Sequence, residues 1–548
     1  MYCVKPGSLF LIFLAYGLVM GITGLAFYGL AGFSQGGTDT LITPDLQLLN
    51  DPYIIQILLF SIKQAGLSAL LSVLLAIPLA RAIYFLPRLA GRTLFLKLCL
   101  LSFVMPTLVL ITGLVALSGR SGLLTPWLGE DWNLYGLQGI LLAHIYLNMP
   151  LAVRVLCQQL NHIPDTSWRL AQQLKFNRWQ LFYRVEWPAV QQTIWLLLAF
   201  IFVLCFNSFA VVLALGGGPA STTLEVAIYQ ALKYDFNLSE ALTLAWLQFL
   251  IAGLIFLVMA RMGKVRWLSA DTHSQRWQPQ WPVWQRHVYS AGYYLSWLVL
   301  LLPMIALLPS VIDARVEQIS LAVMLDSTLY SLLLASGSAI LATLLAWWLL
   351  LAVRHAVNVH KPGWRVLFQW LATHTLVAPA MVLSTGLYIL LLPLIDLERW
   401  GITWLLLLNS VLLLPFVVSQ IQPRLLQFDQ QYHYLAQNLK LSPVQSVQVI
   451  WPFVRPVISS AFSLALLLAL GDVAVFSIFG GSERMTLPWL IYSYAGSYRI
   501  AEAALVSLLL LALCAILVWL FERSYHRPVK GTAAAPRNST SEYNKQET

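Results

Sequence analysis

Long apolar stretches alternate with short polar segments along almost the whole chain. A helix that crosses a membrane needs about 20 mostly apolar residues, because the hydrocarbon core is about 30 Å thick. The pattern predicts twelve such helices, near residues 9–33, 56–80, 98–117, 137–160, 190–213, 241–260, 288–311, 327–353, 367–392, 402–421, 456–479 and 501–521. The sequence therefore predicts an all-α, polytopic membrane protein.

The pattern also repeats, so that the chain has two halves of six predicted spans each. Ser61 and Ala65 in one span correspond to Ser331 and Ala335 in another. Further corresponding residues are Ser68-Ala69 and Ser338-Ala339, Pro106 and Pro379, Gly113 and Gly386, Trp187-Pro188 and Trp451-Pro452, and Thr223-Leu224 and Thr486-Leu487. An even number of spans in each half predicts two parallel repeats, related by an axis along the membrane normal.

Composition and charge agree with this class and orient the chain. Of the 548 residues, 59% are hydrophobic and 10% are charged, whereas soluble domains have about 25% charged residues. With both termini in the cytoplasm, about 26 of the 33 basic residues lie on the inner side, as the positive-inside rule requires. The net charge of +10 then reflects contact with the inner leaflet. The basic residues are scattered over many short loops, which disfavours nucleic-acid binding.

One polar segment occurs twice, at corresponding places in the two halves. Residues 170–175 read LAQQLK and residues 435–440 read LAQNLK. Apolar and basic residues alternate at helical spacing, which predicts helix, turn and helix. Pro188 ends the first copy and begins the next span. Such a pair between spans is suited to contact a cytoplasmic protein. An amphipathic loop resting on the membrane is the alternative, and the duplication disfavours it.

The spacing of this segment resembles the EAA loop of ABC importer permeases. That loop reads Glu-Ala-Ala, three residues, Gly, nine residues, an aliphatic residue, one residue and Leu-Pro. In that family the loop docks into a cleft on a cytoplasmic ATPase subunit, with a small residue where the two backbones approach. The resemblance implies ATPase coupling by Leu170, Ala171, Lys175, Val185 and Pro188 in the first copy, and by Leu435, Ala436, Lys440 and Pro452 in the second.

Both copies depart from the family pattern at the same place. Lys175 and Lys440 stand where the family has glycine. A lysine in a left-handed turn costs roughly 1 kcal/mol relative to glycine. The second copy is also one residue shorter between Lys440 and Pro452. We therefore expect the two loops to differ in geometry or in strength of coupling.

Longer stretches resemble the bacterial thiamine ABC transporter permeases, whose fold is the type I ABC importer (MetI-like) fold. The resemblance is carried by residues 135–144, 204–219, 223–232, 471–472, 479–480, 486–488 and 496–499. It implies thiamine as the cargo, together with its phosphate esters. It also implies two copies of a cytoplasmic ATPase and one periplasmic thiamine-binding protein as partners.

The chain itself fits a subunit that works with such partners. It has no Gly-x4-Gly-Lys-Ser/Thr phosphate loop, so the prediction is a transport subunit that is not an enzyme and holds no cofactor. ATP and magnesium would be used by the partner ATPase. The predicted periplasmic segments are too short for a high-affinity capture domain.

The repeat and the resemblance together divide the chain into six ranges. They are an anchor helix with its periplasmic loop (1–55), a first type I transmembrane domain (56–261) with a coupling loop (161–189), a cytoplasmic linker (262–287), a second anchor helix with its loop (288–326), a second transmembrane domain (327–522) with a coupling loop (423–453), and a disordered cytoplasmic tail (523–548).

Asp472 is an acidic residue within an apolar span, beside Gly471. An ionisable group inside a membrane is costly and is a functional candidate by default. Thiamine has a positively charged thiazolium ring, so Asp472 is a candidate for the substrate path, together with the corresponding Ser208. The alternative is a structural hydrogen bond to a neighbouring helix.

Other polar residues in the spans have plainer interpretations. Lys63 is expected to reach outward to the membrane surface. His144 and His374 have no partner ligands at metal-binding spacing and are expected to be packed polar residues. Gly216-Gly217-Gly218-Pro219 is expected to form a re-entrant turn. The five cysteines lack metal-like spacing and are expected to be small core residues.

Two alternatives to a thiamine permease remain at this stage. One is a permease of the same fold for ferric iron or a polyamine, since these families share the loop and the fold. The other is a secondary transporter driven by an ion gradient. The duplicated loops and the scarcity of acids within the spans disfavour the secondary transporter.

Overall fold

The computed structural model describes residues 6–31, 33–34, 41–42, 45–86, 88–129, 131–262, 282–312, 320–359, 361–376, 378–438, 443–481 and 484–525. The helices are α1 (Pro6–Leu30), α2 (Pro52–Phe85), α3 (Arg92–Val104), α4 (Thr107–Ser118), α5 (Thr125–Leu128), α6 (Leu137–Asn161), α7 (Asp165–Gln173), α8 (Arg178–Leu181), α9 (Trp187–Phe206), α10 (Phe209–Leu215), α11 (Leu224–Lys233), α12 (Leu238–Met262), α13 (Val283–Ile312), α14 (Leu321–Asn358), α15 (Pro362–Thr373), α16 (Ala380–Leu391), α17 (Leu397–Asn438), α18 (Pro443–Leu470), α19 (Ala474–Phe479), α20 (Leu487–Gly496) and α21 (Ile500–Tyr525). Two short strands, β1 (Phe33–Ser34) and β2 (Leu41–Ile42), pair antiparallel.

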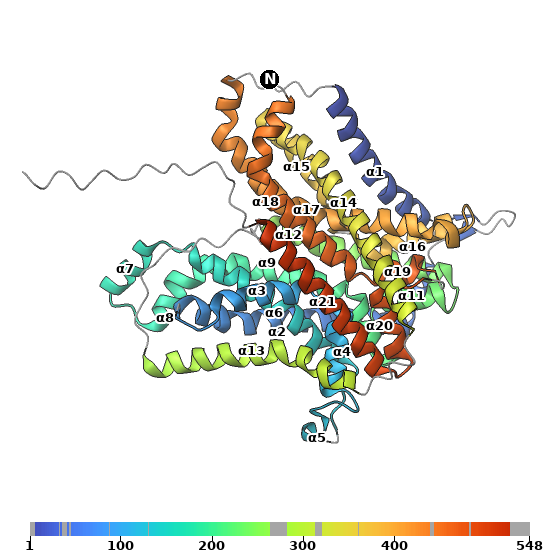
Figure 1. Ribbon diagram of the computed structural model, residues 1–548, viewed down its shortest axis with the longest axis horizontal. Helices are drawn as coiled ribbons and strands as arrows, with labels where there is room; N and C mark the ends of the chain where they lie inside the picture. The colour runs from blue at the N-terminus through green and yellow to red at the C-terminus, as the bar shows by residue number, and fades with distance from the viewer. Residues whose placement is uncertain are drawn as a thin grey trace, which may run out of the picture.

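The predicted all-α polytopic fold is confirmed (Figure 1). Within the described residues, ten helical segments are long and apolar enough to cross a membrane, in place of the twelve expected. The stretch 98–117 is instead a pair, α3 and α4, bent by 103°. The stretch 367–392 is divided into α15, a 3-10 turn (His374–Leu376) and α16. Pro106 and Pro379 directly precede α4 and α16, and proline disfavours helix in the residue before it.

A second pair of breaks also repeats between the halves. The stretch 190–213 is divided into α9 and the short α10, with Asn207 and Ser208 between them. The stretch 456–479 is divided in the same way into α18 and α19, with residues 471–473 between them. Each half therefore has two interrupted apolar stretches, and the candidate residues Ser208 and Asp472 lie at corresponding breaks.

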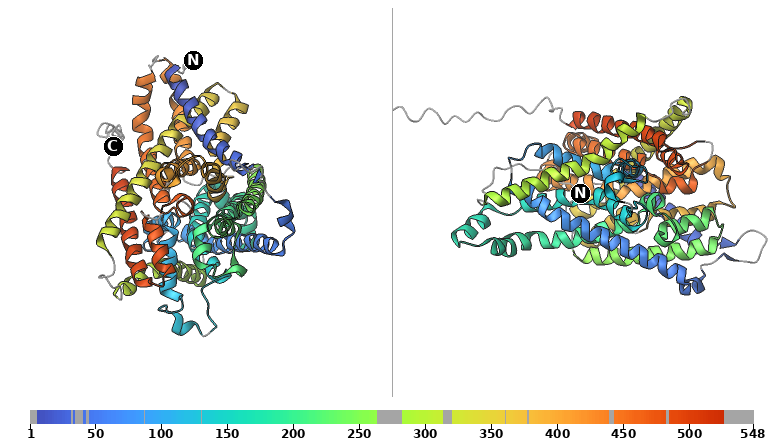
Figure 2. Two further views of the ribbon diagram at one scale, coloured as in Figure 1. Left: turned by 90° about the vertical axis from the view of Figure 1, so that its right-hand side faces the viewer. Right: turned by 90° about the horizontal axis from the view of Figure 1, so that it is seen from below.

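The two halves exchange their anchor helices. α1 packs against α16 and α14 of the second half, and α13 packs against α4 and α2 of the first half. Figures 1 and 2 show the blue α1 beside yellow and orange helices, and the yellow-green α13 beside blue ones. α13 begins at Val283, within the range expected for the linker. Residues 263–281 of that linker, and the tail from residue 526, lie outside the described residues.

Glycine allows the exchanged helices to touch. A Cβ atom added at Gly386 of α16 would overlap the carbonyl oxygen of Ala26 in α1. At the corresponding Gly113 of α4, an added Cβ would lie 2.5 Å from the carbonyl oxygen of Pro303 in α13. Small residues of this kind let membrane helices pack backbone to backbone. The repeated glycine therefore marks the crossing point of each anchor helix.

The serine pair of the repeat makes the same hydrogen bond in both halves. Ser61 Oγ of α2 accepts from the backbone N–H of Leu224, where α11 begins, at 3.1 Å. Ser331 Oγ of α14 accepts from the backbone N–H of Leu487, where α20 begins, at 2.7 Å. We call α2 and α14 the first core helices of the two halves. Each is fixed by this bond to a short helix of its own half, α2 to α11 and α14 to α20.

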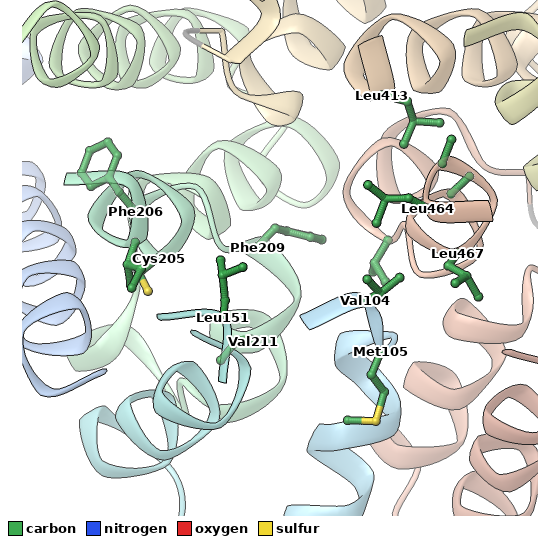
Figure 3. Packing of buried hydrophobic residues seen from close by; sticks show 14 of the residues in the cluster. Val104, Met105, Leu151, Cys205, Phe206, Phe209, Val211, Leu413, Leu464 and Leu467 are labelled. Carbon is green, nitrogen blue, oxygen red and sulfur yellow. The ribbon is translucent and has the colours of Figure 1, made fainter. Parts of the chain in front are cut away.

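The halves also meet in the centre of the molecule. Figure 3 shows Val104, next to the α3–α4 break, beside Leu464 and Leu467 of α18. All three side chains are buried. A Cβ added at Gly471 would lie 3.2 Å from the Cα atom of Pro106. The proline break of the first half thus packs against the break that carries Asp472 in the second.

Candidate functional site: the polar loops and the helix breaks

The first polar loop has the predicted order of helix, turn and helix. α7 ends in a turn, α8 follows, and a π-helical turn (Phe182–Glu186) leads into α9. Asn177 caps α8: its side chain accepts from the N–H of Gln180 at 2.8 Å, and the Gln180 side chain accepts from the N–H of Asn177 at 2.9 Å. This capping box fixes the start of the second arm. Pro188 lies in the first turn of α9, as expected.

The turn of this loop has the left-handed geometry that the sequence predicts at its lysine. Lys175 has a φ angle of 52°. The N–H of Phe176 donates to the carbonyl of Ala171 at 3.0 Å, and the N–H of Lys175 donates to the carbonyl of Gln172 at 2.9 Å. This pair of bonds is the Schellman motif, in which glycine is the usual residue. Lysine occupies it here at a cost of about 1 kcal/mol.

Some apolar side chains of the first loop are buried against the rest of this chain, and others are exposed at its surface. Trp168 and Ala171 are buried, and the ring of Trp168 lies 6.0 Å from that of Tyr84 in α2. Leu170 and Leu174 are 55% and 58% exposed. The side chain of Ala171 packs against this chain, and its part in ATPase coupling stays a prediction. The exposed leucines are the apolar side chains that the α7 arm presents outward.

The second polar loop is described only in part. Leu435 and Ala436 lie in the last turns of α17, but their side chains, and all of Lys440, lie outside the described residues. Pro452 lies inside α18, which begins at Pro443. In the first half the helical segment through Pro188 begins at Arg178 and includes the π-helical turn. The outgoing arm of this loop is the end of the long helix α17, whereas the first loop has a separate short helix, α7, in that place.

The two loops lie at separate tips of the molecule. Figure 1 shows α7 at the left and the α17–α18 tip at the top, whereas α11 and α20 lie close together away from both tips. Burial raises the pKa of Tyr229 of α11 most, the neighbouring Tyr234 raises it further, and Tyr492 of α20 adds the smallest effect, which places α11 and α20 near each other.

Asp472 caps the short helix α19. Its carboxylate accepts from the N–H groups of Val475 and Phe476 at 3.5 and 3.4 Å and from the side-chain amide of Asn409 in α17 at 3.5 Å. It also lines a cavity of about 10 Å³, together with Ser331, Leu334, Ala469, Leu470, Phe476 and Thr486. That volume is at the lower limit for one water molecule, so no cargo fits there in this conformation. The hydrogen bond to a neighbouring helix, expected as the structural alternative, is present.

The corresponding break in the first half has a different polar arrangement. Ser208 precedes α10 and makes no capping hydrogen bond with its side chain. Gln248 of α12 instead donates to Asn207 at 3.3 Å and to the buried Glu225 of α11 at 2.5 Å. Burial raises the pKa of Glu225 to about 8. Sequence reasoning missed Glu225, although it is the one acidic residue of α11.

Two buried ion pairs were also missed. Arg81 of α2 donates to Glu186 at 2.7 and 3.1 Å, and Arg354 of α14 donates to Asp429 of α17 at 2.6 Å through each of two nitrogens. The partners are 105 and 75 residues apart along the chain, and no local pattern joins them. Each pair connects the first core helix of its half with an arm of that half's polar loop.

The remaining polar candidates lie as packed residues or at the surface. His144 Nδ1 lies 3.0 Å from Ser68 Oγ, and His374 Nε2 lies 2.9 Å from Thr23 Oγ1. Lys63 is exposed. Gly217 and Gly218 have positive φ angles, as a tight turn requires. Among the described residues no cluster of metal ligands occurs, and the four cysteines there are buried and form no disulfide.

Comparison with known proteins identifies the family. The chain is 35% identical over 489 residues to the thiamine transport system permease protein ThiP of Escherichia coli (strain K12), covering 88% of this chain and 91% of that protein. It is 36% identical to ThiP of Haemophilus influenzae, covering 85% and 88%. This chain belongs to the ThiP family of thiamine transport system permeases. The similarity extends through both halves and both polar loops. No family model matches the chain.

A ferric-iron permease is a much narrower match than the ThiP proteins. The ferric transport system permease protein FbpB of Actinobacillus pleuropneumoniae is 28% identical over 221 residues, which cover 39% of this chain and 32% of that protein. Membership of the ThiP family therefore identifies this chain as an ABC transporter permease, a multi-pass membrane protein with the type I fold.

Proposed function

We propose that this chain is the membrane-spanning subunit of an ABC importer that carries thiamine, and thiamine phosphates, across the bacterial inner membrane. The observation that carries the proposal is the similarity to ThiP proteins over nearly nine-tenths of both chains. The ATP-driven step belongs to a separate cytoplasmic ATPase, with one copy at each polar loop. A periplasmic thiamine-binding protein delivers the cargo at the opposite side.

Alternating access gives each part of the molecule a role. ATP binding closes the ATPase pair, so the two loop tips approach each other and the side at α11 and α20 opens to receive cargo. Hydrolysis then returns the tips to their separate positions. In this proposal both termini lie in the cytoplasm, on the same side as the loops, which the distribution of basic residues supports.

Uptake in cells tests the proposed substrate. Deleting this gene should abolish high-affinity uptake of labelled thiamine, and a plasmid copy should restore it. Ferric-iron uptake in the same strain is the control and should not change. Normal thiamine uptake in the deletion strain would remove thiamine as the cargo, and a loss of iron uptake would favour the alternative family.

Asp472 and Ser208 are proposed to border the substrate path, because each lies at a helix break near the centre of the molecule. Asp472→Asn keeps a hydrogen-bonding side chain and removes the negative charge. We expect the protein to accumulate normally and thiamine uptake to fall about tenfold, the effect of losing one interaction of ~1.4 kcal/mol with the cationic cargo.

The matched control for this substitution is Asp326→Asn, at an exposed position near the start of α14. It makes the same chemical change away from the break and should leave uptake unchanged. If Asp472→Asn transports thiamine as well as the parent chain does, Asp472 is a helix cap and takes no part in cargo recognition.

A further inference from the structure

Two pairs of residues connect the polar loops to the interior of the molecule in both halves. Glu186 lies directly before α9, where the first loop returns to the membrane domain. Its carboxylate is 1% exposed, and Arg81 of α2 holds both of its oxygens. Asp429 is 5% exposed, and Arg354 of α14 holds both of its oxygens in the same bidentate way.

A buried ion pair of this kind is a poor source of stability, because removing two charges from water costs about as much as their attraction returns. Its geometry is nevertheless strict, since a bidentate contact fixes the orientation of both groups. Aromatic rings restrict the first pair further: the Arg81 guanidinium lies 5.3 Å from the Phe182 ring and 5.9 Å from the Tyr289 ring of α13. The two pairs therefore specify a position more than they contribute stability.

The end of α2 holds both arms of the first loop. Arg81 holds the returning arm through Glu186. Tyr84 and Phe85 hold the outgoing arm through Trp168, whose ring lies 6.0 and 5.7 Å from theirs. A displacement of the loop must therefore displace this end of α2.

The same helix makes contacts at the break in the first half. Gln64 donates to the carbonyl of Cys205 at 2.9 Å, just before the α9–α10 break, and Ser61 binds the start of α11. An α-helix rises about 1.5 Å per residue, so Arg81 and Gln64 are about 25 Å apart along α2, which continues as one helix through Pro78. In the second half, α14 contains both Arg354 and Ser331, and Ser331 binds the start of α20.

From these contacts we infer that Arg81–Glu186 and Arg354–Asp429 are positioning pairs that transmit movement of the polar loops to the first core helix of each half, and through it to the helix breaks. The two pairs act on different arms: Glu186 follows the turn of its loop, whereas Asp429 lies in α17, before the turn of the other. Through these ion pairs the first half receives movement from its returning arm and the second half from its outgoing arm, and Trp168 adds a contact from the outgoing arm of the first loop to α2.

This inference rests on the proposed function. A double-mutant cycle tests the role of the ion pair in a transporter whose parent form takes up thiamine. Arg81→Gln, Glu186→Gln and the exchanged pair Arg81→Glu with Glu186→Arg are compared in the full transporter. The measured quantity is thiamine taken up per ATP hydrolysed. We expect each single substitution to lower this ratio at least about fivefold, the lower range for coupling between sites, while ATP hydrolysis continues. The exchanged pair should recover most of the loss.

Arg499→Gln is the matched control. It breaks the Arg499–Glu502 pair at the start of α21 and the contact of Arg499 with the Tyr494 ring of α20, and neither contact involves a polar loop. The uptake ratio should stay at the parent value. Arg81→Lys, which keeps the charge but not the bidentate contact, should lie between the parent and Arg81→Gln, and it provides a milder variant if Arg81→Gln does not accumulate.

Hydrogen exchange of the full chain in detergent supplies a second readout that needs no cargo. Glu186→Gln should speed exchange at the backbone amides of the first loop and leave those of α17 unchanged, and Asp429→Asn should do the reverse. Single variants that keep both the parent uptake ratio and the parent exchange would overturn the inference. So would an exchanged pair that restores protein accumulation without restoring the ratio. A parent chain that takes up no thiamine would contradict the proposed function and leave the exchange test in force.

Discussion

Replacing Gly386 with leucine should prevent the chain from accumulating as a folded protein. The Cβ of any residue at this position overlaps the carbonyl oxygen of Ala26, and it would also lie 2.7 Å from Leu30 Cγ. The first obstacle is backbone, so no rotation of a side chain relieves it. Forcing larger side chains into a packed core costs about 1–3 kcal/mol or more, and here the whole α1–α16 crossing must separate.

The measurement is the yield of monodisperse protein and its thermal unfolding in detergent. Gly24→Leu is the matched control. Gly24 lies on α1, the other helix of this crossing, and nothing lies within 4 Å of a Cβ added there. It should behave like the parent chain. Gly113→Leu should be almost as damaging as Gly386→Leu, because its added Cβ meets the backbone of Pro303. A Gly386→Leu protein that unfolds at the parent temperature would show that α1 does not pack on α16 as described.

Substituting glutamate for Leu170 or Leu174 should remove the ATPase from the transporter without unfolding it. Both side chains are more than half exposed, Leu170 on α7 and Leu174 as the C-cap of that helix, so this chain does not need them for its own packing. An apolar side chain that enters a partner's cleft contributes roughly 1.5–3 kcal/mol, and a buried charge in its place opposes binding. We expect co-purification of the ATPase, and uptake with it, to fall at least about tenfold.

The control for these variants is Gln172→Glu, which adds the same charge to an exposed position elsewhere on α7. Co-purification should then stay near the parent level. Ala171→Glu is a different experiment, because Ala171 is buried against its own chain, and the substitution should disturb the loop itself. If Leu170→Glu and Leu174→Glu bind the ATPase as the parent does, the exposed face of α7 is not the docking surface.

The sequence predicted most of the helices and the left-handed turn, because both depend on local pattern. Apolar stretches of sufficient length mark spanning helices wherever they occur, and the loop motif placed Lys175 where the turn needs a positive φ angle. The breaks before α4 and α16 were missed, because the apolar stretch continues through Pro106 and Pro379. Hydropathy measures composition and is insensitive to such a bend.

Contacts between distant segments could not be predicted. Nothing in the pattern of α1 indicates that it packs on the second half, since its apolar residues suit any neighbour in a membrane. Arg81 and Glu186 are 105 residues apart, and each looked like an ordinary charge at the end of a span. Ala171 was expected to face a partner because of its small size, whereas its side chain is buried within this chain.

Uptake by reconstituted vesicles tests the central claim most directly. The vesicles contain this chain and its ATPase, with the binding protein and labelled thiamine on one side and ATP on the other. The account predicts that thiamine accumulates only when all three proteins and ATP are present, and that ferric iron does not accumulate. Thiamine uptake that proceeds without the ATPase under an ion gradient, or no uptake with the complete set, would contradict it.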